Sequence, residues 1–170
     1  MHRFSYLALA VIMLFGSAFG QIAEDEKLPN GEYRMEPYVE SNENAGGKPI
    51  RNPAVLEAFG GPEGVQRVVD RFVDGMREDP RTGDIMRASD PIRLRRTLGE
   101  QFTYLLGAEG ATYSGRDMRA THIDHGITTS EFNAAIEVLQ KAMEAENVPF
   151  RMQNKLLSRL APMHREIVTR

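Results

Sequence analysis

The chain has 170 residues, of which 26% are charged and 41% hydrophobic, with a formal net charge of -3 and neither cysteine nor tryptophan. This length and composition describe one ordinary soluble domain with a modest extension, and the lack of cysteine excludes a disulfide scaffold and a zinc–cysteine site. The weakly acidic balance lacks the clustered Lys and Arg that binding to a phosphate backbone requires, so we expect no nucleic-acid partner.

Residues 1–20 have the composition of an export signal. A short basic start precedes an apolar run from Tyr6 to Phe15, and small residues follow around Ala18 and Gly20. This pattern predicts a secretory signal peptide that is cleaved after Gly20. The apolar run is shorter than the roughly 20 residues that a membrane-spanning helix needs. We therefore expect an exported protein, periplasmic or secreted, with no stable membrane span after cleavage.

Residues 21–53 form an acidic leader that is rich in Pro, Gly and Asn and shows no helical or strand periodicity. Such a stretch buries too little apolar surface to offset the entropy lost on ordering. We expect a solvated and largely disordered leader, in which Tyr33, Tyr38 and Val39 dock locally.

From Ala54 onward the sequence has the periodicity of helices. Between Gly61 and Asp79, apolar residues recur every three or four positions and predict one buried helix face: Val65, Val68, Val69, Phe72, Val73 and Met76. A second helix is predicted from the cap at Asp90-Pro91 to Gly107. A Gly-rich loop then leads to a short amphipathic segment that ends at His122.

Two further helices complete the prediction. A capping box from Thr128 to Glu131 opens one of them, and the last runs from Phe150 to Val168, where Pro162 is expected to kink or split it. No strand alternation and no internal repeat are seen. Residues 54–170 are therefore predicted to form one all-α domain.

Few side chains in this domain are suited to chemistry. The sequence has no His-Glu-x-x-His zinc motif, no Glu-x-x-His pair and no phosphate-binding loop, so hydrolytic and nucleotide chemistry lack support. His122 has apolar neighbours in Met118, one turn earlier, and Ile127. Spacing alone leaves two interpretations open, a structural histidine and a metal ligand. His125 and His164 are expected at the surface.

At these residues the chain from about Leu56 to Val168 resembles the group I truncated haemoglobins, small globins with a two-over-two helical sandwich around a non-covalent b-type haem. Each matching motif is short, but their order and spacing cover almost the whole domain. The motifs are Phe59-Gly60-Gly61, Val69-Asp70-Arg71-Phe72, Asp79-Pro80-Arg81-Thr82, Arg93-Leu94, Tyr113-Ser114-Gly115-Arg116-Asp117-Met118, His122 with Gly126-Ile127-Thr128, Phe132-Asn133, Val148-Pro149 and Leu160-Ala161-Pro162-Met163.

The resemblance implies that His122 is the proximal axial ligand of haem iron and leaves the opposite face of the iron to a diatomic gas. Its second ring nitrogen is expected to donate to a nearby carbonyl. The resemblance also implies which apolar side chains line the haem pocket: Met118, Ile127 and Phe132 on the proximal side, Leu94, Leu98 and Phe102 from the distal helix, and Phe72 and Val73 below them.

The chain departs from the family at three pocket positions. Val73 stands where many relatives carry a distal tyrosine, Met86 where globins place a phenylalanine against the porphyrin, and Leu98 where relatives often have glutamine. Because the tyrosine and the glutamine of the relatives are both hydrogen-bond donors, their absence here is expected to weaken the retention of oxygen. Gln101 and Tyr104 are the polar side chains that compensate if they reach the ligand.

These observations favour an exported haem protein that binds oxygen, nitric oxide or carbon monoxide reversibly. Oxygen storage or delivery, nitric oxide detoxification and peroxide or redox chemistry stay open within this reading. Nitric oxide dioxygenase or peroxidase-like activity would need an external reductase as electron donor. Two alternatives belong to other classes: a six-coordinate haem protein for electron transfer, and a helical binding module without haem.

Overall fold

The computed structural model describes residues 27–170, so the predicted signal peptide over 1–20 lies outside the described residues. The chain divides into two units, Met1–Glu36 and Pro37–Arg170. In the described part of the first unit, Lys27 and Tyr33 form an isolated antiparallel bridge around a turn, in which the Gly31 amide donates to the Leu28 carbonyl over 2.8 Å.

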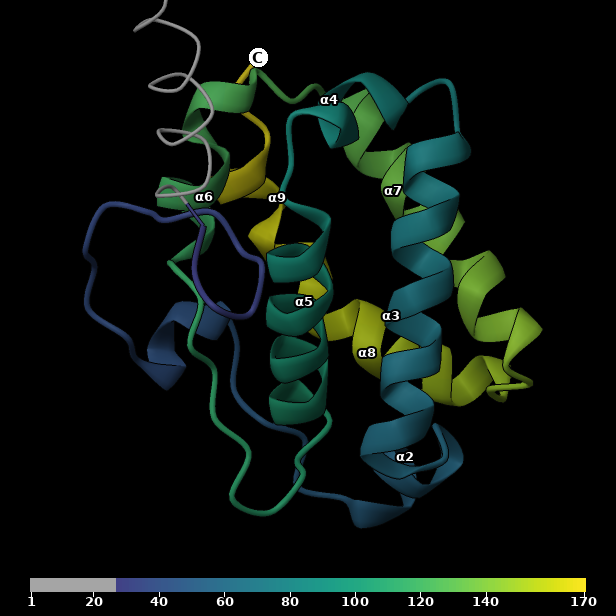
Figure 1. Cartoon of the computed structure of the whole chain (residues 1–170). Coiled ribbons are helices and arrows are strands. Elements are labelled where there is room, and N and C mark those ends of the chain that lie inside the picture. The colour runs from purple at the N-terminus through teal and green to yellow at the C-terminus, as the bar shows by residue number, and fades with distance from the viewer. Residues whose placement is uncertain (1–26) are drawn as a thin grey trace, which may run out of the picture. The chain divides into compact units, whose positions relative to one another are not determined.

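The regular secondary structure of the second unit is helical (Figure 1), and over the described residues no strand is present. This confirms the all-α class predicted from the sequence. The α-helices are α2 (Pro53–Ala58), α3 (Gly61–Glu78), α4 (Gly83–Arg87), α5 (Pro91–Leu105), α6 (Met118–His122), α7 (Thr129–Ala145), α8 (Phe150–Leu160) and α9 (His164–Ile167). Three short 3-10 segments are η1 (Asn42–Ala45), η2 (Ile123–His125) and η3 (Ala161–Met163).

Helix α3 lies at the centre of the packing and contacts both α5 and α7. Its apolar stripe is buried as the sequence predicts, at Val65, Val68, Val69, Phe72, Val73 and Met76. The ring of Phe72 stacks on that of Phe102 of α5, with centroids 6.4 Å apart. Because aromatic pairs of this kind add to the burial of apolar area, they fix the packing of α3 on α5.

Local signals set the helix ends. The Asp90 carboxylate accepts hydrogen bonds from the amides of Ile92 and Arg93, and Pro91 occupies the first turn of α5. Thr128 and Glu131 form the capping box that begins α7. The predicted break at Pro162 also occurs, because α8 ends before it and α9 begins after it.

The chain just before the helical domain differs from the prediction. The sequence predicts a disordered leader over 21–53, but residues 37–50, here called the strap, are ordered against the helices. Ala45 is fully buried and Ile50 is 8% exposed, and both belong to the core. The physical reason is that polar groups of the strap find partners far along the chain, such as the Ser114 carbonyl, which accepts from the Tyr38 hydroxyl over 2.8 Å.

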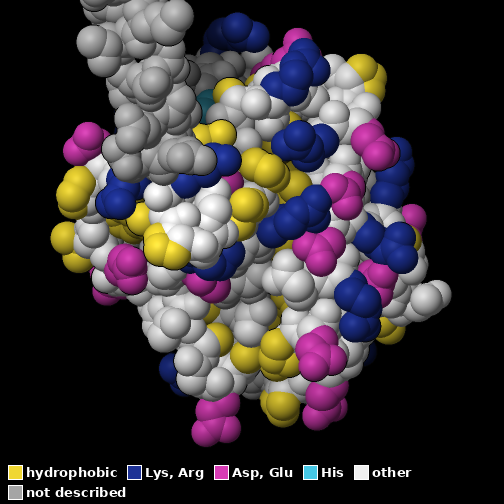
Figure 2. All heavy atoms as spheres, in the orientation of Figure 1, with side chains coloured by type: hydrophobic (Ala, Val, Ile, Leu, Met, Phe, Trp, Pro, Cys, Tyr) yellow, Lys and Arg dark blue, Asp and Glu magenta, His cyan; other side chains and the backbone are white. Residues whose placement is uncertain are grey.

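The surface carries both signs of charge. On the face seen in Figure 2, Lys and Arg side chains alternate with Asp and Glu side chains. Arg95 of α5, for example, pairs with Asp74 of α3 over 2.5 Å and with Asp70 over 3.2 Å. Among residues 27–170, no helix is both long and apolar enough to cross a membrane.

Candidate haem site

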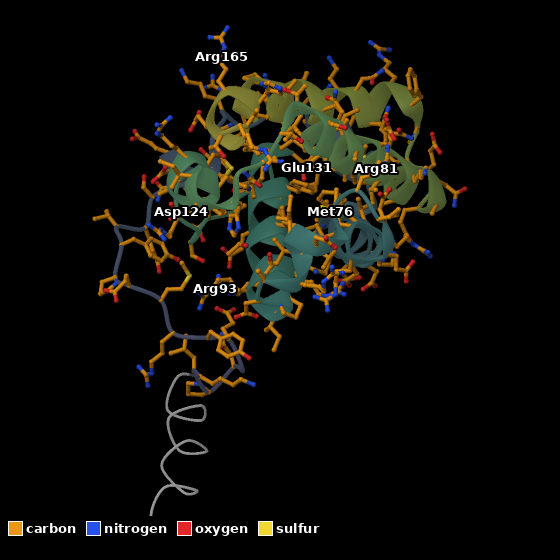
Figure 3. The ribbon with its side chains drawn as sticks, turned by 90° about the horizontal axis from the view of Figure 1, so that it is seen from above. Met76, Arg81, Arg93, Asp124, Glu131 and Arg165 are labelled. Atoms are coloured by element: carbon orange, nitrogen blue, oxygen red, sulfur yellow. The ribbon has the colours of Figure 1, made fainter. Side chains whose placement is uncertain are left out.

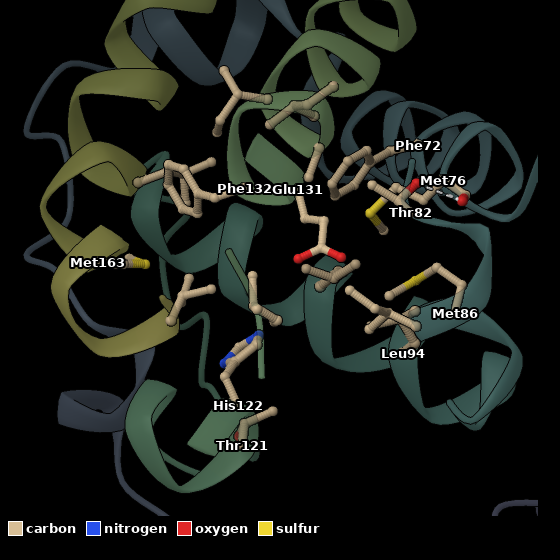
Figure 4. A pocket seen from close by; sticks show the side chains of 18 of the residues that line it. Phe72, Met76, Thr82, Met86, Leu94, Thr121, His122, Glu131, Phe132 and Met163 are labelled. Carbon is tan, nitrogen blue, oxygen red and sulfur yellow. Dashed lines mark hydrogen bonds between the residues drawn. The ribbon is translucent and has the colours of Figure 1, made fainter. Parts of the chain in front are cut away.

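A pocket lies between α3, α4 and α5 on one side and α6, α7 and α9 on the other. Figure 4 shows this pocket with His122 projecting into it from α6. Most of the site residues named from the sequence lie in its lining, namely Phe72, Met86, Leu94, Leu98, Gln101, Phe102, Met118, His122, Ile127 and Phe132. Residues separated by almost the whole domain thus meet around one largely apolar space.

Val73 and Tyr104, also named from the sequence, do not line the pocket. Val73 is fully buried but belongs to the core. It follows Phe72 directly on α3, and because successive helical residues are about 100° apart, the two side chains face different neighbours. Tyr104 lies near the end of α5 and is half-buried against the core.

His122 is the last residue of α6, and its ring is held in one orientation. Its Nδ1 lies 2.6 Å from the carbonyl oxygen of Met118. Because a carbonyl only accepts, Nδ1 carries the proton and donates, which leaves the lone pair on Nε2. Burial lowers the pKa of His122 below its ordinary value and so favours this neutral form. A neutral imidazole with a free Nε2 is the form that coordinates a metal.

The hydroxyl groups in the lining are occupied by the backbone. The Thr82 hydroxyl donates to the Met76 carbonyl over 2.7 Å, and the Thr121 hydroxyl donates to the Asp117 carbonyl over 2.9 Å. The amide of Gln101 donates to the Ala45 carbonyl over 3.0 Å. The pocket therefore presents mainly apolar surface to whatever it holds.

Glu131 also lines the pocket, although it was not among the site residues predicted from the sequence. Figure 3 shows Glu131 and Met76 among the helices, whereas Arg165 points outward. In Figure 4 the carboxylate of Glu131 faces the pocket. One oxygen accepts from the Thr128 amide over 2.7 Å and from its hydroxyl over 2.6 Å. These hydrogen bonds lower the pKa of Glu131. In the sequence, Glu131 is already accounted for as the last residue of the capping box. No further sequence feature indicated that it lines the pocket.

The donor set suits haem. In the described part of the chain, no group of three or more His, Cys, Asp or Glu side chains is placed to hold a metal ion. Two histidines line the pocket, the partly buried His122 and the exposed His125. One imidazole at an apolar pocket is what a planar, largely apolar cofactor needs when its own nitrogens supply the other ligands of the iron. Phe72, Leu98 and Phe132 contribute to the apolar lining, and His122 Nε2 is the nitrogen that would hold the iron of such a cofactor.

Fold and pocket together define the class, a small helical protein with a largely apolar pocket into which His122 projects. The chain belongs to the bacterial-like globin family, whose sequence model matches residues 54–169. This family implies a haem cofactor and a gaseous ligand.

Individual relatives agree with this membership. The chain is 28% identical over 118 residues to the group 1 truncated hemoglobin GlbN of Mycolicibacterium paratuberculosis, a match that covers 68% of this chain and 85% of the relative. The truncated hemoglobin of Tetrahymena pyriformis in its Fe(III) form has a similar fold, with a TM-score of 0.64 at 20% identity over 68% of this chain and 98% of that one.

A truncated hemoglobin of Chlamydomonas reinhardtii gives a TM-score of 0.59 at 23% identity over 68% of this chain and 95% of that one. These solved structures bear out the truncated-globin fold that the sequence predicts.

Proposed function

We propose that this chain is an exported globin that binds haem b and takes up a diatomic gas reversibly. The observation that carries the proposal is the 2.6 Å contact between His122 Nδ1 and the Met118 carbonyl, which leaves Nε2 free at an apolar pocket. Haem bound there would be held by His122 and would supply the iron at which the gas binds. Because the chain has no cysteine, attachment is non-covalent, as in haem b.

The residues around the pocket have separate tasks. The Met118 carbonyl fixes the tautomer and the orientation of the His122 ring and makes its Nε2 more basic. Leu94, Leu98 and Phe102 of α5 line the pocket and would keep water away from a bound cofactor. Keeping water out would protect a reduced haem iron from oxidation and keep gas binding reversible.

The polarity of the pocket favours nitric oxide handling over tight oxygen storage. A strong oxygen store uses hydrogen-bond donors beside the gas, and here Thr82 and Gln101 donate to backbone carbonyls instead. The binding of nitric oxide to haem iron depends less on such hydrogen-bond donors. Turnover of nitric oxide would require an external reductase, which we propose as a partner.

Export is proposed from residues 1–20, because their composition is that of a cleaved signal peptide. Expression of the whole chain in a bacterium, followed by fractionation and N-terminal sequencing, tests this. We expect a periplasmic or secreted product that begins at Gln21. A cytoplasmic product that retains Met1 would exclude export.

The haem proposal is tested with the mature chain, Gln21–Arg170, reconstituted with haemin. Absorption spectra are recorded for the ferric, ferrous and carbon monoxide-treated ferrous protein, beside His122→Gly. The matched control is His164→Gly, which removes a helical histidine that does not line the pocket. We expect a Soret band that shifts with carbon monoxide and is lost or altered only in His122→Gly.

Two other outcomes would overturn the proposal. A six-coordinate ferrous spectrum without added gas indicates an electron-transfer protein, in which a side chain takes the open position. Haemin binding no better than to an unrelated helical protein indicates a binding module without haem.

A further inference from the structure

The Gln101 side chain is buried in the wall of the haem pocket and fixed there. It is 4% exposed, and its Nε2 donates to the Ala45 carbonyl over 3.0 Å. The same nitrogen lies 3.4 Å from Met118 Sδ and 3.8 Å from Met163 Sδ. A buried amide rarely gives up such partners, because an unpaired polar group in an apolar interior costs free energy.

Ala45 belongs to the strap, which is anchored at several places on the helical domain. Near its start, Asn42 Oδ1 accepts from the Tyr113 amide over 2.7 Å, and Asn44 Nδ2 donates to the Gly115 carbonyl over 3.1 Å. At its end, the Ile50 amide donates to the Leu105 carbonyl over 2.9 Å. The anchors hold Ala45 in register with Gln101.

The strap also packs closely against pocket residues. A Cβ atom built on Gly46, whose φ is +75°, would lie 2.9 Å from Met163 Cε and 3.1 Å from Met118 Cγ. A side chain at this position therefore forces Met163 and Met118 to shift, and its backbone conformation strongly favours glycine. Residues 37–50 lie outside the part matched by the globin family, which begins at residue 54.

We propose that the strap is a specificity element, which positions the Gln101 amide against Ala45 and so withholds it from a gas in the pocket. The inference rests on the proposed function. A free amide donor in a dry pocket stabilises dioxygen, which draws negative charge from the iron, more than it stabilises nitric oxide or carbon monoxide. Because the strap accepts one N–H of this amide and holds the group beside Met118 Sδ, it shifts selectivity away from oxygen retention.

The test displaces the strap in the full mature chain. Gly46→Val places a β-branched side chain in the left-handed region beside Met163, whereas the control Gly110→Val has φ +69° and no atom within 4 Å of its Cβ position. Asn42→Ala with Asn44→Ala is a milder second variant that removes two anchors. Gln101→Leu is combined with each of these variants.

Two measurements report on the freed amide. We expect Gly46→Val to lower the carbon monoxide stretching frequency of the ferrous protein and to slow oxygen dissociation about fivefold, the effect of one ordinary hydrogen bond. Asn42→Ala with Asn44→Ala acts in the same direction, Gly110→Val keeps the parent values, and added Gln101→Leu abolishes the shift. A change in these two measurements that came only from a loosened fold would persist when Gln101→Leu is added.

The outcomes that overturn the inference differ from those that overturn the proposed function. If oxygen dissociates faster when Gln101→Leu is introduced alone, the amide already contacts the gas and the inference is wrong. It is equally wrong if both strap variants bind gas with no change that depends on Gln101. A parent chain that takes up haemin but shows no carbon monoxide shift overturns the proposed function itself.

Discussion

Several polar side chains of the pocket bond to the protein backbone. Thr82, Thr121 and Gln101 each donate to a carbonyl of the main chain. Buried polar groups need hydrogen-bond partners, and here the backbone supplies them. The pocket can therefore stay largely apolar although polar residues stand in its wall. His122 follows the same rule at Nδ1 and has Nε2 left for a ligand.

The buried hydroxyl of Thr82 allows a test of one of these hydrogen bonds. Thr82 is 4% exposed, and its hydroxyl donates to the Met76 carbonyl over 2.7 Å. We expect Thr82→Val to lower the free energy of unfolding by about 1 kcal/mol, because the isosteric side chain loses this hydrogen bond. Urea unfolding of the haem-free protein measures the change, with Thr82→Ser as the control that keeps the hydroxyl. A Thr82→Val variant as stable as the parent would contradict this role.

At the scale of elements, helix ends position the site. His122 ends α6, and Glu131 stands in the first turn of α7. The α7 capping box therefore sets both the beginning of the helix and the place of a carboxylate in the pocket.

The capping box gives the second prediction. Thr128→Ala removes the side-chain oxygen that accepts from the Glu131 amide and is expected to cost about 1 kcal/mol of folding free energy. Thr128→Ser is the matched control and retains the acceptor. Thermal and urea unfolding check this expectation, which fails if the alanine and serine variants are equally stable.

The elements that were predictable from the sequence are those with local signals. The apolar stripe of α3, the cap at Asp90 and the break at Pro162 each depend on neighbours within a few turns. The strap was mispredicted because its order depends on residues distant in sequence, as in the bond between Asn42 and the Tyr113 amide.

The prediction of the site rests on a different kind of signal. Spacing left His122 as one of two interpretations, and only the resemblance to truncated haemoglobins singled it out as an iron ligand. Of the polar candidates, Gln101 does line the pocket and Tyr104 does not. Whether the Gln101 amide is free could not be predicted, because its partner Ala45 lies in a segment without periodicity.

Across the whole molecule, ion pairs connect α3 and the loop that follows it to neighbouring helices. Arg67 and Arg71 both pair with Glu146 after α7, and Arg81 joins Asp79 to Glu137 of α7. Each exposed pair contributes little alone, but together they fix the helices that carry the pocket.

Asp79 gives a prediction for pH dependence. Hydrogen bonds from the side chain and amide of Arg81 lower its pKa from 3.8 to about 2. A lowered carboxylate pKa adds stability above 3.8, and that contribution is lost as the pH falls towards 2. We expect Asp79→Asn to lower the melting temperature at neutral pH, with a difference from the parent that shrinks in acid.

The control is Asp84→Asn, which removes an exposed carboxylate paired with Arg87 inside α4. It is expected to leave the melting temperature close to that of the parent. A difference between Asp79→Asn and the parent that stays constant down to acid pH would contradict the assignment.

The most direct test of the account is the iron–histidine stretching band in the resonance Raman spectrum of the ferrous reconstituted protein. The band reports the bond from His122 Nε2 itself. We expect it in the parent chain, its loss in His122→Gly, and its return when imidazole is added to that variant. An unchanged band in His122→Gly would show that another group holds the iron and would contradict the central claim.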